Sequence, residues 1–227
     1  MQVSVIIPVY NEEGYIAKCL QSLEAQVEKA DEIIVVDNNC HDKTIEIAKK
    51  FDVRIIKEEK QGMIYARNAG FDSAKYEILA RTDADAIVPP DWIAKSKKAF
   101  EDPALDALSG PAIFFEKLIV VPVSKILVSL YFHVLGLILG HPPIFGPNTV
   151  LRKSAWEKVK NNVCLLDKDV HEDIDLSIHL AKIGKIKFDN NFTVRSTRGR
   201  WSQVFTEYIV RLVKMLYYHR GNRTSKK

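Results

Sequence analysis

Residues 76–86 read YEILARTDADA, and this stretch decides the fold class. Its first five residues form a mostly apolar run, which is typical of a buried strand. Asp83 and Asp85 follow at the end of that run, and Arg81 is the only basic residue beside them. Two carboxylates this close together disfavour each other's ionisation. We therefore expect a positively charged group to bind at the end of this strand.

The chain before this stretch alternates apolar runs with segments of helical spacing. The spacing predicts strands at residues 3–7, 32–36, 53–56 and 76–80, and helices at residues 13–27, 43–51 and 63–74. Continuous β-branched strands separated by helices predict an α/β fold with a mostly parallel sheet covered by helices on both faces. Ligands of such sheets bind beyond the carboxyl ends of the strands, where residues 8–11, 37–39 and 83–85 fall.

The second half of the chain is less regular. The sequence predicts a strand in residues 107–115, a long apolar segment at residues 118–140, and helices at residues 170–182 and 201–218. No internal repeat or linker of low complexity is present. We expect one domain over residues 1–200, followed by an amphipathic helix and a basic tail at 201–227.

Composition places the chain among ordinary globular proteins. Its 227 residues are 47% apolar and 27% charged, enough for one domain with a full core. Cys19, Cys40 and Cys164 lie far apart and form no disulfide framework, which favours a reducing, cytoplasmic setting. Met1 leads directly into a strand-like run without a basic segment, so no signal peptide is expected.

The charge of the chain is asymmetric. Residues 195–227 contain nine Lys or Arg and one acid, so they carry +8 and the rest of the chain carries −4. Such a tail indicates an anionic partner, which could be a membrane surface, a phosphate or nucleic acid; a solvated end is the alternative. The excess of basic residues is confined to the tail and no base-stacking module is evident, so we expect no nucleic-acid partner.

The apolar segment 118–140 contains 23 residues, which is long enough to span a bilayer. Lys125 near its middle would cost about 2.5–3.5 kcal/mol there. The polar and small residues of the segment, Lys125, Ser129, His133, Gly136 and Gly140, line one helical face. A helix that lies on a membrane, or that packs with this stripe inward, fits better. We expect a peripheral protein on the inner face of the membrane; a homodimer that buries the same surfaces is the alternative.

Polar residues follow the first two predicted strands. Asn11 is a good helix N-cap, while Pro8 and Tyr10 would lie at the rim, where they could frame a planar base. Asp37 could accept hydrogen bonds from a base or from ribose hydroxyls, or it could be a turn residue. Neither G-x-G-x-x-G after the first strand nor G-x-x-x-x-G-K-[ST] occurs, which argues against dinucleotide and P-loop sites.

Two acidic motifs have residue types that can bind a metal ion or move a proton. Asp83 and Asp85 offer hard oxygen ligands for Mg²⁺ or Mn²⁺, which commonly take one or two carboxylates plus phosphates. Asp173 lies at the predicted start of helix 170–182 and could act as a general base, or simply cap that helix. His171, Glu172 and Asp173 could instead bind a metal, but the absence of a second His at i+4 makes this the weaker hypothesis.

Six stretches, taken in order, resemble family 2 glycosyltransferases, the inverting nucleotide-sugar enzymes with the Rossmann-like GT-A fold. They are VSVIIPVYNEEGYI (3–16), EIIVVDNNCHDKT (32–44), GMIYARNAGFDSA (62–74), RTDADA (81–86), GPNTVLRKSAW (146–156) and HEDIDLSIHLAKIG (171–184). The resemblance covers roughly residues 3–201. Each stretch is weak evidence alone, but six of them in order are specific.

The resemblance implies a role for each matching residue. The nucleotide-sugar contacts would be Pro8, Tyr10, Glu12, Asp37 and Asp83, with Arg67 as a further donor-side residue or, alternatively, a surface charge. Asp85 would be the metal ligand beside Asp83, and Asp173 the catalytic base, paired with Glu172. The loop Gly146, Pro147 and Asn148 would lie near the donor sugar or the acceptor. Arg198, Arg200 and Trp201 would face the diphosphate.

The resemblance also implies the reaction. Asp173 would take a proton from an acceptor hydroxyl, whose oxygen attacks the anomeric carbon and displaces the diphosphate with inversion. Thr197 stands where processive relatives carry the Gln of Q-x-x-R-W, which favours transfer of a single sugar. We expect the acceptor to be a lipid or a lipid-linked saccharide. A module of the same fold that binds a nucleotide or a membrane without turnover is the alternative.

Overall fold

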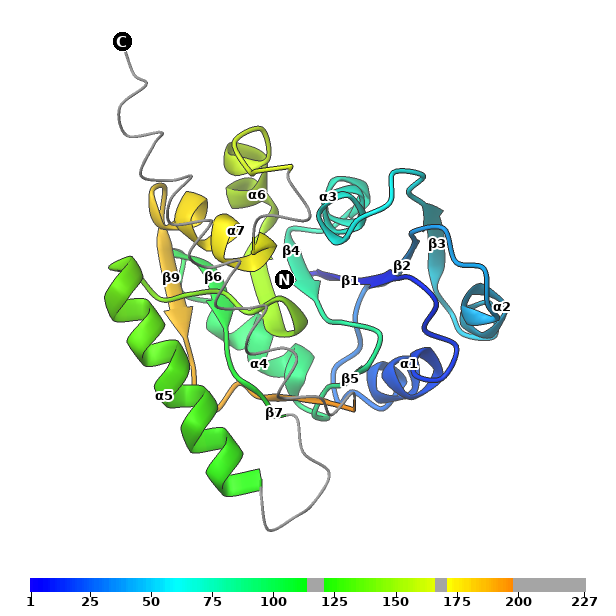
Figure 1. The fold of residues 1–227 in the computed structure, drawn as a ribbon, viewed down its shortest axis with the longest axis horizontal. Helices are drawn as coiled ribbons and strands as arrows, with labels where there is room; N and C mark the ends of the chain where they lie inside the picture. The colour runs from blue at the N-terminus through cyan, green and yellow to red at the C-terminus, as the bar shows by residue number, and fades with distance from the viewer. Residues whose placement is uncertain (114–120, 166–170, 198–227) are drawn as a thin grey trace.

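The computed structural model describes residues 1–113, 121–165 and 171–197. Its centre is a seven-stranded sheet with the order β3-β2-β1-β4-β8-β6-β9, seen nearly edge-on in Figure 1. The strands are β1 (Val3–Val9), β2 (Glu32–Asp37), β3 (Arg54–Lys57), β4 (Ile78–Arg81), β6 (Leu105–Ser109), β8 (Thr149–Arg152) and β9 (Lys185–Phe188). The strand predicted at 76–80 is therefore β4, which is the central strand of the sheet and lies beside β1.

The sheet is mostly parallel, as the sequence predicted. β1 runs parallel to β2 and β4, and β2 runs parallel to β3. β8 is antiparallel to both β4 and β6, while β9 is parallel to β6. The carboxyl ends of β1, β2 and β4 therefore lie along one edge of the sheet, and this edge carries the candidate site.

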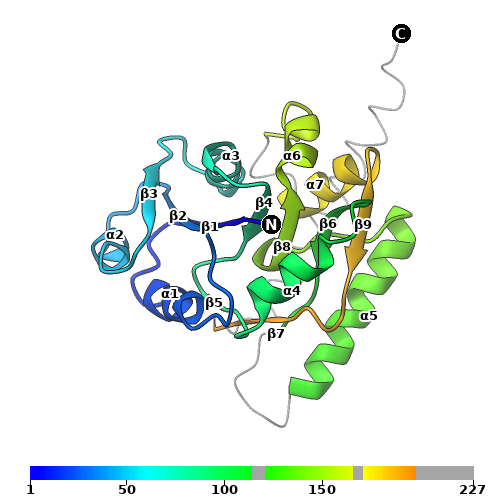
Figure 2. The same cartoon turned by 180° about the vertical axis from the view of Figure 1, so that it is seen from behind.

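Helices cover both faces of the sheet because alternate strand residues point to opposite sides. Val5 and Ile7 of β1 belong to one apolar core and Ile6 belongs to the other. The first core contains residues of α1 (Ile16–Glu24), α2 (Thr44–Ala48), α4 (Trp92–Ala99) and α5 (Val121–Leu139). The second contains residues of α3 (Met63–Ser73), α6 (Lys153–Val159) and α7 (Glu172–Ala181). Figures 1 and 2 show these two layers from opposite sides.

The predicted strand 107–115 is wrong in its extent. The chain forms β6 and then β7 (Ala112–Ile113), which belongs to a separate small sheet with the order β5-β10-β7. Gly110 separates the two strands, and a Cβ there would lie 1.9 Å from the carbonyl oxygen of Phe192. The close approach of the segment before β10 (Val194–Ser196) therefore requires a glycine and ends β6. β5 is formed by Ala86–Ile87.

The predicted cap at Asn11 is also wrong. α1 begins at Ile16, with Tyr15 at the N-cap position, and has no acidic residue in its first turn. Asn11 instead has a φ of 55°, a left-handed conformation that Asn adopts more readily than most residues. Asn11 thus shapes the loop after β1 rather than the helix.

The helix α5 lies within the predicted apolar segment, but its inward face differs from the predicted one. Val128, Phe132 and Leu135 are buried, whereas His133 of the polar stripe is exposed. The opposite face is also apolar, with exposed side chains at Ile126, Leu130, Val134, Leu137 and Ile138. In the three described ranges, no helix has the length and apolarity needed to cross a membrane. The predicted helix 201–218 and tail lie outside the described residues.

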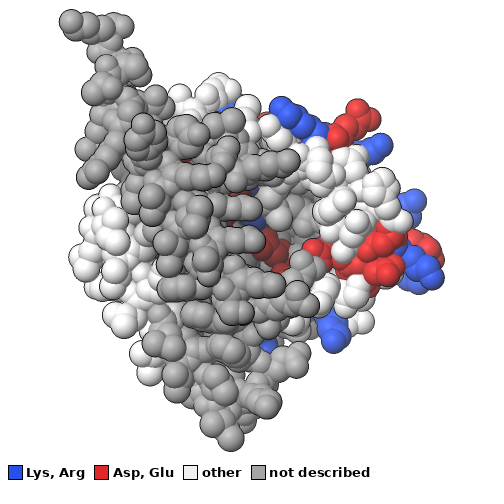
Figure 3. All heavy atoms as spheres, viewed as in Figure 1, with Lys and Arg blue, Asp and Glu red and all other residues white. Residues whose placement is uncertain are grey.

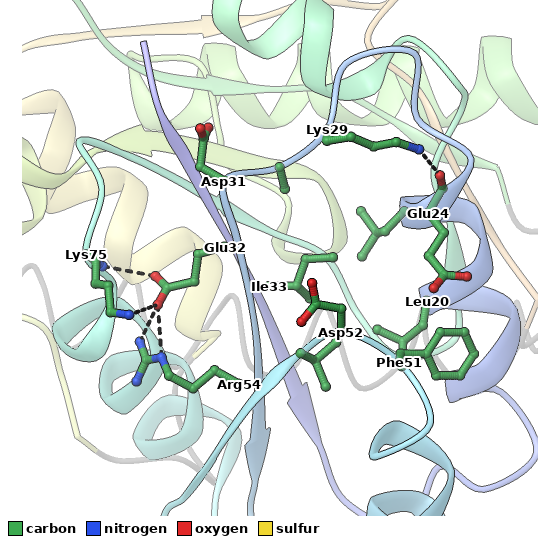
Figure 4. A pocket seen from close by; sticks show the side chains of 13 residues that line it. Leu20, Glu24, Lys29, Asp31, Glu32, Ile33, Phe51, Asp52, Arg54 and Lys75 are labelled. Carbon is green, nitrogen blue, oxygen red and sulfur yellow. Dashed lines mark hydrogen bonds and ion pairs between the residues drawn. The ribbon is translucent and has the colours of Figure 1, made fainter.

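The edge of the sheet opposite the candidate site is held by an ion cluster around Glu32. Glu32 accepts hydrogen bonds from the Ser4 hydroxyl (2.8 Å), from Arg54 Nε (2.9 Å) and from the Lys75 backbone (3.0 Å). Figure 4 shows Arg54 and Lys75 converging on this carboxylate at one wall of a pocket of about 530 Å³. Burial raises the pKa of Glu32, but these hydrogen bonds and the charge of Arg54 outweigh burial and hold the pKa below its usual value.

We predict that Glu32→Gln lowers the free energy of unfolding at pH 7 by about 1–2 kcal/mol, because the charge-assisted hydrogen bonds become neutral ones. A depressed carboxyl pKa stabilises the fold above its unfolded value near 4.3, and this contribution is lost as the pH falls through the folded value. Urea unfolding of both proteins at pH 7 and pH 3.5 measures the difference. An equal difference at both pH values would contradict the prediction.

Candidate active site

The loops after β1 and β2 are braced against each other. The backbone N–H of His41 donates to Asn11 Oδ1 at 2.8 Å, and the backbone N–H of Glu12 donates to Thr44 Oγ1 at 2.7 Å. These bonds use the side chain of Asn11 and the backbone of Glu12, and they leave the Tyr10 side chain 48% exposed. Tyr10 therefore lies at the surface of the predicted nucleotide side, where an aromatic ring can stack on a base.

Pro8 and Asp37 are partly structural. Pro8 is buried within β1 opposite Val36, so it lies inside the strand rather than at the rim. One oxygen of Asp37 accepts a hydrogen bond from the backbone N–H of Cys40 at 2.8 Å, as a turn residue does. Asp37 nevertheless ends β2 at the edge of the sheet that carries the site, and it remains half-buried.

Asn38 was missed by the sequence analysis. It is 3% exposed, its amide donates to the carbonyl oxygens of Glu58 (2.9 Å) and Lys60 (2.8 Å), and its oxygen accepts from the N–H of Gly62 (2.8 Å). One side chain therefore fixes the loop between β3 and α3 against the end of β2. The sequence carries no signal for this role, because an Asn in a polar loop is common.

The two carboxylates of the predicted metal motif lie between β4 and β5. Asp83 Oδ1 accepts a hydrogen bond from Arg81 Nη2 at 3.2 Å. Ser196 Oγ donates to Asp85 Oδ2 at 3.3 Å, while the N–H and hydroxyl of Thr197 both donate to the Asp85 carbonyl at 2.8 Å. The end of β10 thus holds Asp85, and neither Ser196 nor its partner strand was predicted from sequence.

The two carboxylates of the motif repel each other. Burial and the charge of Asp85 together raise the pKa of Asp83 to about 6, although Arg81 opposes both effects. Acidic atoms are visible in the hollow at the middle of the face shown in Figure 3. A cation bound here would relieve the repulsion that the sequence analysis identified.

The second acidic motif is the first turn of α7, where two buried arginines hold Glu172. Arg81 Nη1 donates to Glu172 Oε1 at 2.5 Å, and Arg67 Nη1 donates to both Glu172 Oε2 and the Glu172 carbonyl. Arg67 is 0% exposed, so the alternative of a surface charge is wrong. Arg81 Nη1 also donates to Asp173 Oδ1 at 3.2 Å.

These contacts give the neighbouring carboxyl groups of Glu172 and Asp173 very different pKa values. Burial raises the pKa of Glu172, but the guanidinium groups of Arg81 and Arg67 outweigh burial and hold the pKa far below its usual value. Burial and the charge of Glu172 instead raise the pKa of Asp173 well above its usual value. Glu172 is therefore a fixed anion, and Asp173 is the member of the pair with the higher proton affinity, which is what a general base needs.

The loop Gly146 to Asn148 forms the short 3₁₀ helix η1 and packs against Asp173. The N–H of Gly146 donates to Asp173 Oδ2 at 2.9 Å. A Cβ at this position would lie 2.6 and 2.8 Å from the Asp173 oxygens and 2.9 Å from Arg81 Nη2. Only glycine lets the backbone approach the carboxylate this closely.

The rest of the loop is tied to its surroundings. Asn148 is 0% exposed; its oxygen accepts from Trp92 Nε1 at 2.9 Å, and its amide donates to the Phe192 carbonyl at 2.5 Å. Pro147 is half-buried. The Asn148 side chain therefore joins α4 to the segment before β10, and this fixes the loop that holds Asp173. Arg198, Arg200 and Trp201, expected at the diphosphate, lie outside the described residues.

The predicted cation site fits the residues that are present. Across residues 1–113, 121–165 and 171–197, no three His, Cys, Asp or Glu side chains gather to hold a metal ion, and the hypothesis of a His171, Glu172 and Asp173 site is thus unsupported. A cation at Asp83 and Asp85 would take its other ligands from water and from substrate phosphates, as Mg²⁺ and Mn²⁺ commonly do.

Comparison with known proteins matches residues 4–156 to the family described as Glycosyl transferase family 2. The chain is similar to glycosyltransferase AglE of Haloferax volcanii, with 36% identity over 120 residues that cover 49% of this chain and 40% of that protein. It is also similar to the Methanococcus voltae dolichyl N-acetyl-alpha-D-glucosaminyl phosphate 3-beta-D-2,3-diacetamido-2,3-dideoxy-beta-D-glucuronosyltransferase, with 26% identity over 217 residues, 88% of this chain and 68% of that protein.

Among solved structures, the chain resembles the mannosyltransferase PcManGT from Pyrobaculum calidifontis in complex with GDP-Man and Mn²⁺. The TM-score is 0.72 at 21% identity, and the match covers 99% of this chain and 65% of that one. This similarity supports the mixed α/β fold with a mostly parallel sheet. The chain spans 40% of the length of the Haloferax protein, so it corresponds to part of that relative.

We predict that Gly146→Ala displaces Asp173 and lowers the free energy of unfolding by about 1–3 kcal/mol, the usual cost of overpacking a filled site. Thermal or urea unfolding measures the loss. Gly14→Ala is the matched control, because a Cβ at Gly14 meets no atom within 4 Å. Equal stability of the two variants would show that the loop does not need a glycine at position 146.

Proposed function

The chain belongs to glycosyltransferase family 2, and from this premise we propose that it transfers a single hexosyl unit from a nucleotide-diphosphate sugar to a hydroxyl acceptor, with inversion at the anomeric carbon. One observation carries the proposal. Arg81 bonds both Asp83 of the first acidic motif and Asp173 of the second, which is 92 positions away from Arg81 along the chain. The leaving-group side and the base are therefore adjacent, as a displacement at one carbon requires.

Asp173 is the base in this proposal. Its raised pKa makes the ionised carboxylate a stronger base, which takes the acceptor's proton as the hydroxyl oxygen attacks the anomeric carbon and the bond to the diphosphate breaks. Gly146 and Arg81 hold its carboxylate in place. Glu172 supports the reaction as a buried anion that fixes the arginines, since its own pKa is too low for proton exchange.

The donor would lie along the edge formed by β1, β2 and β4. We assign the base and ribose to Tyr10, Glu12 and Asp37, with Pro8 shaping the floor of the site and Arg67 acting through Glu172. Asp83 and Asp85 would hold Mg²⁺ or Mn²⁺, which supplies positive charge to the departing diphosphate when it is bound. The family pattern adds Arg198, Arg200 and Trp201 to the diphosphate and Pro147 and Asn148 to the donor-sugar and acceptor loop.

We propose a lipid or a lipid-linked saccharide as the acceptor. The Methanococcus voltae relative has dolichyl N-acetyl-alpha-D-glucosaminyl phosphate in its name, and it matches 88% of this chain. Two features of the chain agree with a membrane partner. The outer face of α5 exposes five large apolar side chains, and residues 195–227 carry nine basic residues against one acid. Apolar area binds the acyl boundary and basic residues bind anionic headgroups.

We predict that substitutions in the two acidic motifs impair different steps, metal-dependent nucleotide binding in one and turnover in the other. Asp85→Asn should weaken Mn²⁺-dependent binding of UDP or GDP and abolish transfer. Asp173→Asn should keep donor affinity but lower turnover by roughly 10²–10⁴-fold, the range for a lost general base. Calorimetry with each nucleotide, and release of nucleotide from UDP-GlcNAc and GDP-mannose, measure both effects.

Unchanged metal-dependent binding in Asp85→Asn would reject the metal assignment, and normal turnover in Asp173→Asn would reject the base. A wild-type protein that binds nucleotide diphosphates but releases none from any sugar donor would indicate a binding module. Val27→Ser, a surface change in the turn after α1, is the control for both assays.

For the membrane, we predict that the protein sediments with vesicles of phosphatidylglycerol and phosphatidylcholine at low salt. Leu137→Ser/Ile138→Ser should weaken this binding by about tenfold or more, since each of these exposed side chains contributes about 1.5–3 kcal/mol when fully buried. Removal of residues 220–227, which contain four basic residues, should make binding weaker and less sensitive to salt.

Val27→Ser serves again as the matched control, because Val27 is 77% exposed and lies outside α5. Equal loss in Val27→Ser and in the α5 variant would contradict a specific docking face. A protein that stays free of the vesicles and elutes as a stable dimer would instead support burial of α5 between two copies.

A further inference from the structure

We propose that Arg81 is a positioning residue that joins the metal motif to the catalytic base, and that its charge limits how tightly the free enzyme holds a divalent cation. This inference rests on the proposed function for the roles of Asp83, Asp85 and Asp173. It adds a residue that neither the motifs nor the comparisons assign. Three observations carry it: the contacts of the guanidinium group, its burial, and the charge balance around it.

The guanidinium group of Arg81 is shared between the two motifs. Nη2 donates to Asp83 Oδ1 at 3.2 Å, and Nη1 donates to Glu172 Oε1 at 2.5 Å and to Asp173 Oδ1 at 3.2 Å. Asp83 follows β4 and the other two begin α7, so Arg81 connects the middle of the sheet to a helix that lies over its edge. A planar group with two separate nitrogens can span these carboxylates, whereas an ammonium group presents a single point charge.

Within the part of the chain that the structure describes, this guanidinium group is held by carboxylates. Arg81 is 3% exposed, and its Nε is buried with no hydrogen-bond partner among the described residues. The position of the group therefore depends on where the two motifs lie. Gly146 limits the space on one side, since a Cβ there would lie 2.9 Å from Arg81 Nη2. A displacement of Asp83 would be transmitted through Arg81 to Asp173.

Arg67 has a different role from Arg81. Its hydrogen bonds go to the side chain and the carbonyl of Glu172 and to the side-chain oxygen of Asn68, whereas those of Arg81 reach Asp83 and Asp173. Arg67 therefore anchors Glu172 to α3. Because Glu172 is fixed in this way, Arg81 has a stationary partner on one side and the two functional carboxylates on the other.

Positive charge lies next to the proposed metal motif. Arg67 and Arg81 form ion pairs with three carboxylates, those of Asp83, Glu172 and Asp173. Removing Arg81 would take away the guanidinium group that contacts Asp83, a proposed metal ligand. At the short separations seen here, one unit charge changes the binding of a doubly charged ion by well over tenfold, even at an effective dielectric constant near 20.

The proposal predicts opposite effects on metal binding and on turnover. Arg81→Met should bind Mn²⁺ at least about tenfold more tightly in the absence of nucleotide, because a nearby positive charge is gone. Its kcat should fall by at least about tenfold with little change in the donor KM, because Asp173 loses its hydrogen bond from Arg81. Arg81→Lys should keep the Mn²⁺ affinity within about threefold of wild type and still lose kcat, since lysine cannot span both motifs.

The readouts are the free Mn²⁺ signal in electron paramagnetic resonance during titration with Mn²⁺ alone, and nucleotide release from UDP-GlcNAc and GDP-mannose. Arg81→Met leaves buried carboxylates facing one another, so Arg81→Met/Glu172→Gln is measured too. That variant removes one charge of each sign, and it should bind Mn²⁺ as wild type does while kcat stays low. Arg54→Lys, in the ion cluster of Figure 4 at the opposite edge of the sheet, is the matched control.

A Mn²⁺ affinity in Arg81→Met equal to or weaker than that of wild type would overturn the inference, whatever the activity. Retention of wild-type kcat by Arg81→Lys would do the same. A residue that only stabilises the fold would lower the melting temperature without changing the Mn²⁺ affinity. Failure of the proposed function is distinguishable, because wild type itself would then release no nucleotide while the Mn²⁺ titrations still report on Arg81.

Discussion

Buried negative charge is the constraint on which the site depends. The carboxylates of Asp83, Glu172 and Asp173 meet Arg81 where β4 ends and α7 begins, and water cannot solvate them fully there. The fold places two arginines inside the cluster, and one of them is fully buried. Breaking such a pair usually costs about 3–5 kcal/mol, whereas the complete cluster contributes little net stability. We attribute the network to a different role. It fixes which carboxyl group stays ionised and which can take up a proton.

Much of the fold could be predicted from sequence because its regular parts are local. The first four strands and the helices between them follow from β-branched runs and helical spacing, and α7 was predicted within two residues of its observed ends. The errors have non-local causes. The extent of the strand after α4 depends on contact between Gly110 and the carbonyl of Phe192, more than 80 residues later. The inward face of α5 depends on which of its two apolar faces meets the sheet, and the narrow polar stripe of the helix does not decide between them.

In the candidate site, too, the sequence predicts the local features and misses those that depend on distant contacts. The motifs supplied the types of residue, so Asp83, Asp85 and Asp173 could be proposed from sequence, and the structure brings Asp83 and Asp173 to one guanidinium group. The sequence could not predict how deeply each of these side chains is buried or which residues it contacts. Arg67 was open to two interpretations until Glu172 was seen against it, and Arg81 was noticed only as a neighbour of Asp83. Asn38, Asn148 and Ser196 hold loops through contacts with distant backbone or carboxylate groups, and polar residues of these types are common in loops that hold nothing.

The long separation between Arg81 and Glu172 has a consequence for synthesis of the protein. The two residues are 91 positions apart, and the intervening chain supplies β8, β6 and the loop of Gly146. Ribosomes add roughly 5–20 residues per second, so a nascent chain carries Arg81 for roughly 5–20 s before α7 can cover it. During that interval β4 lacks its antiparallel neighbour β8 and presents an unpaired edge to solvent. The charge of Arg81 at the end of this strand discourages pairing with another chain, which makes the residue a gatekeeper in biogenesis before it becomes part of the site.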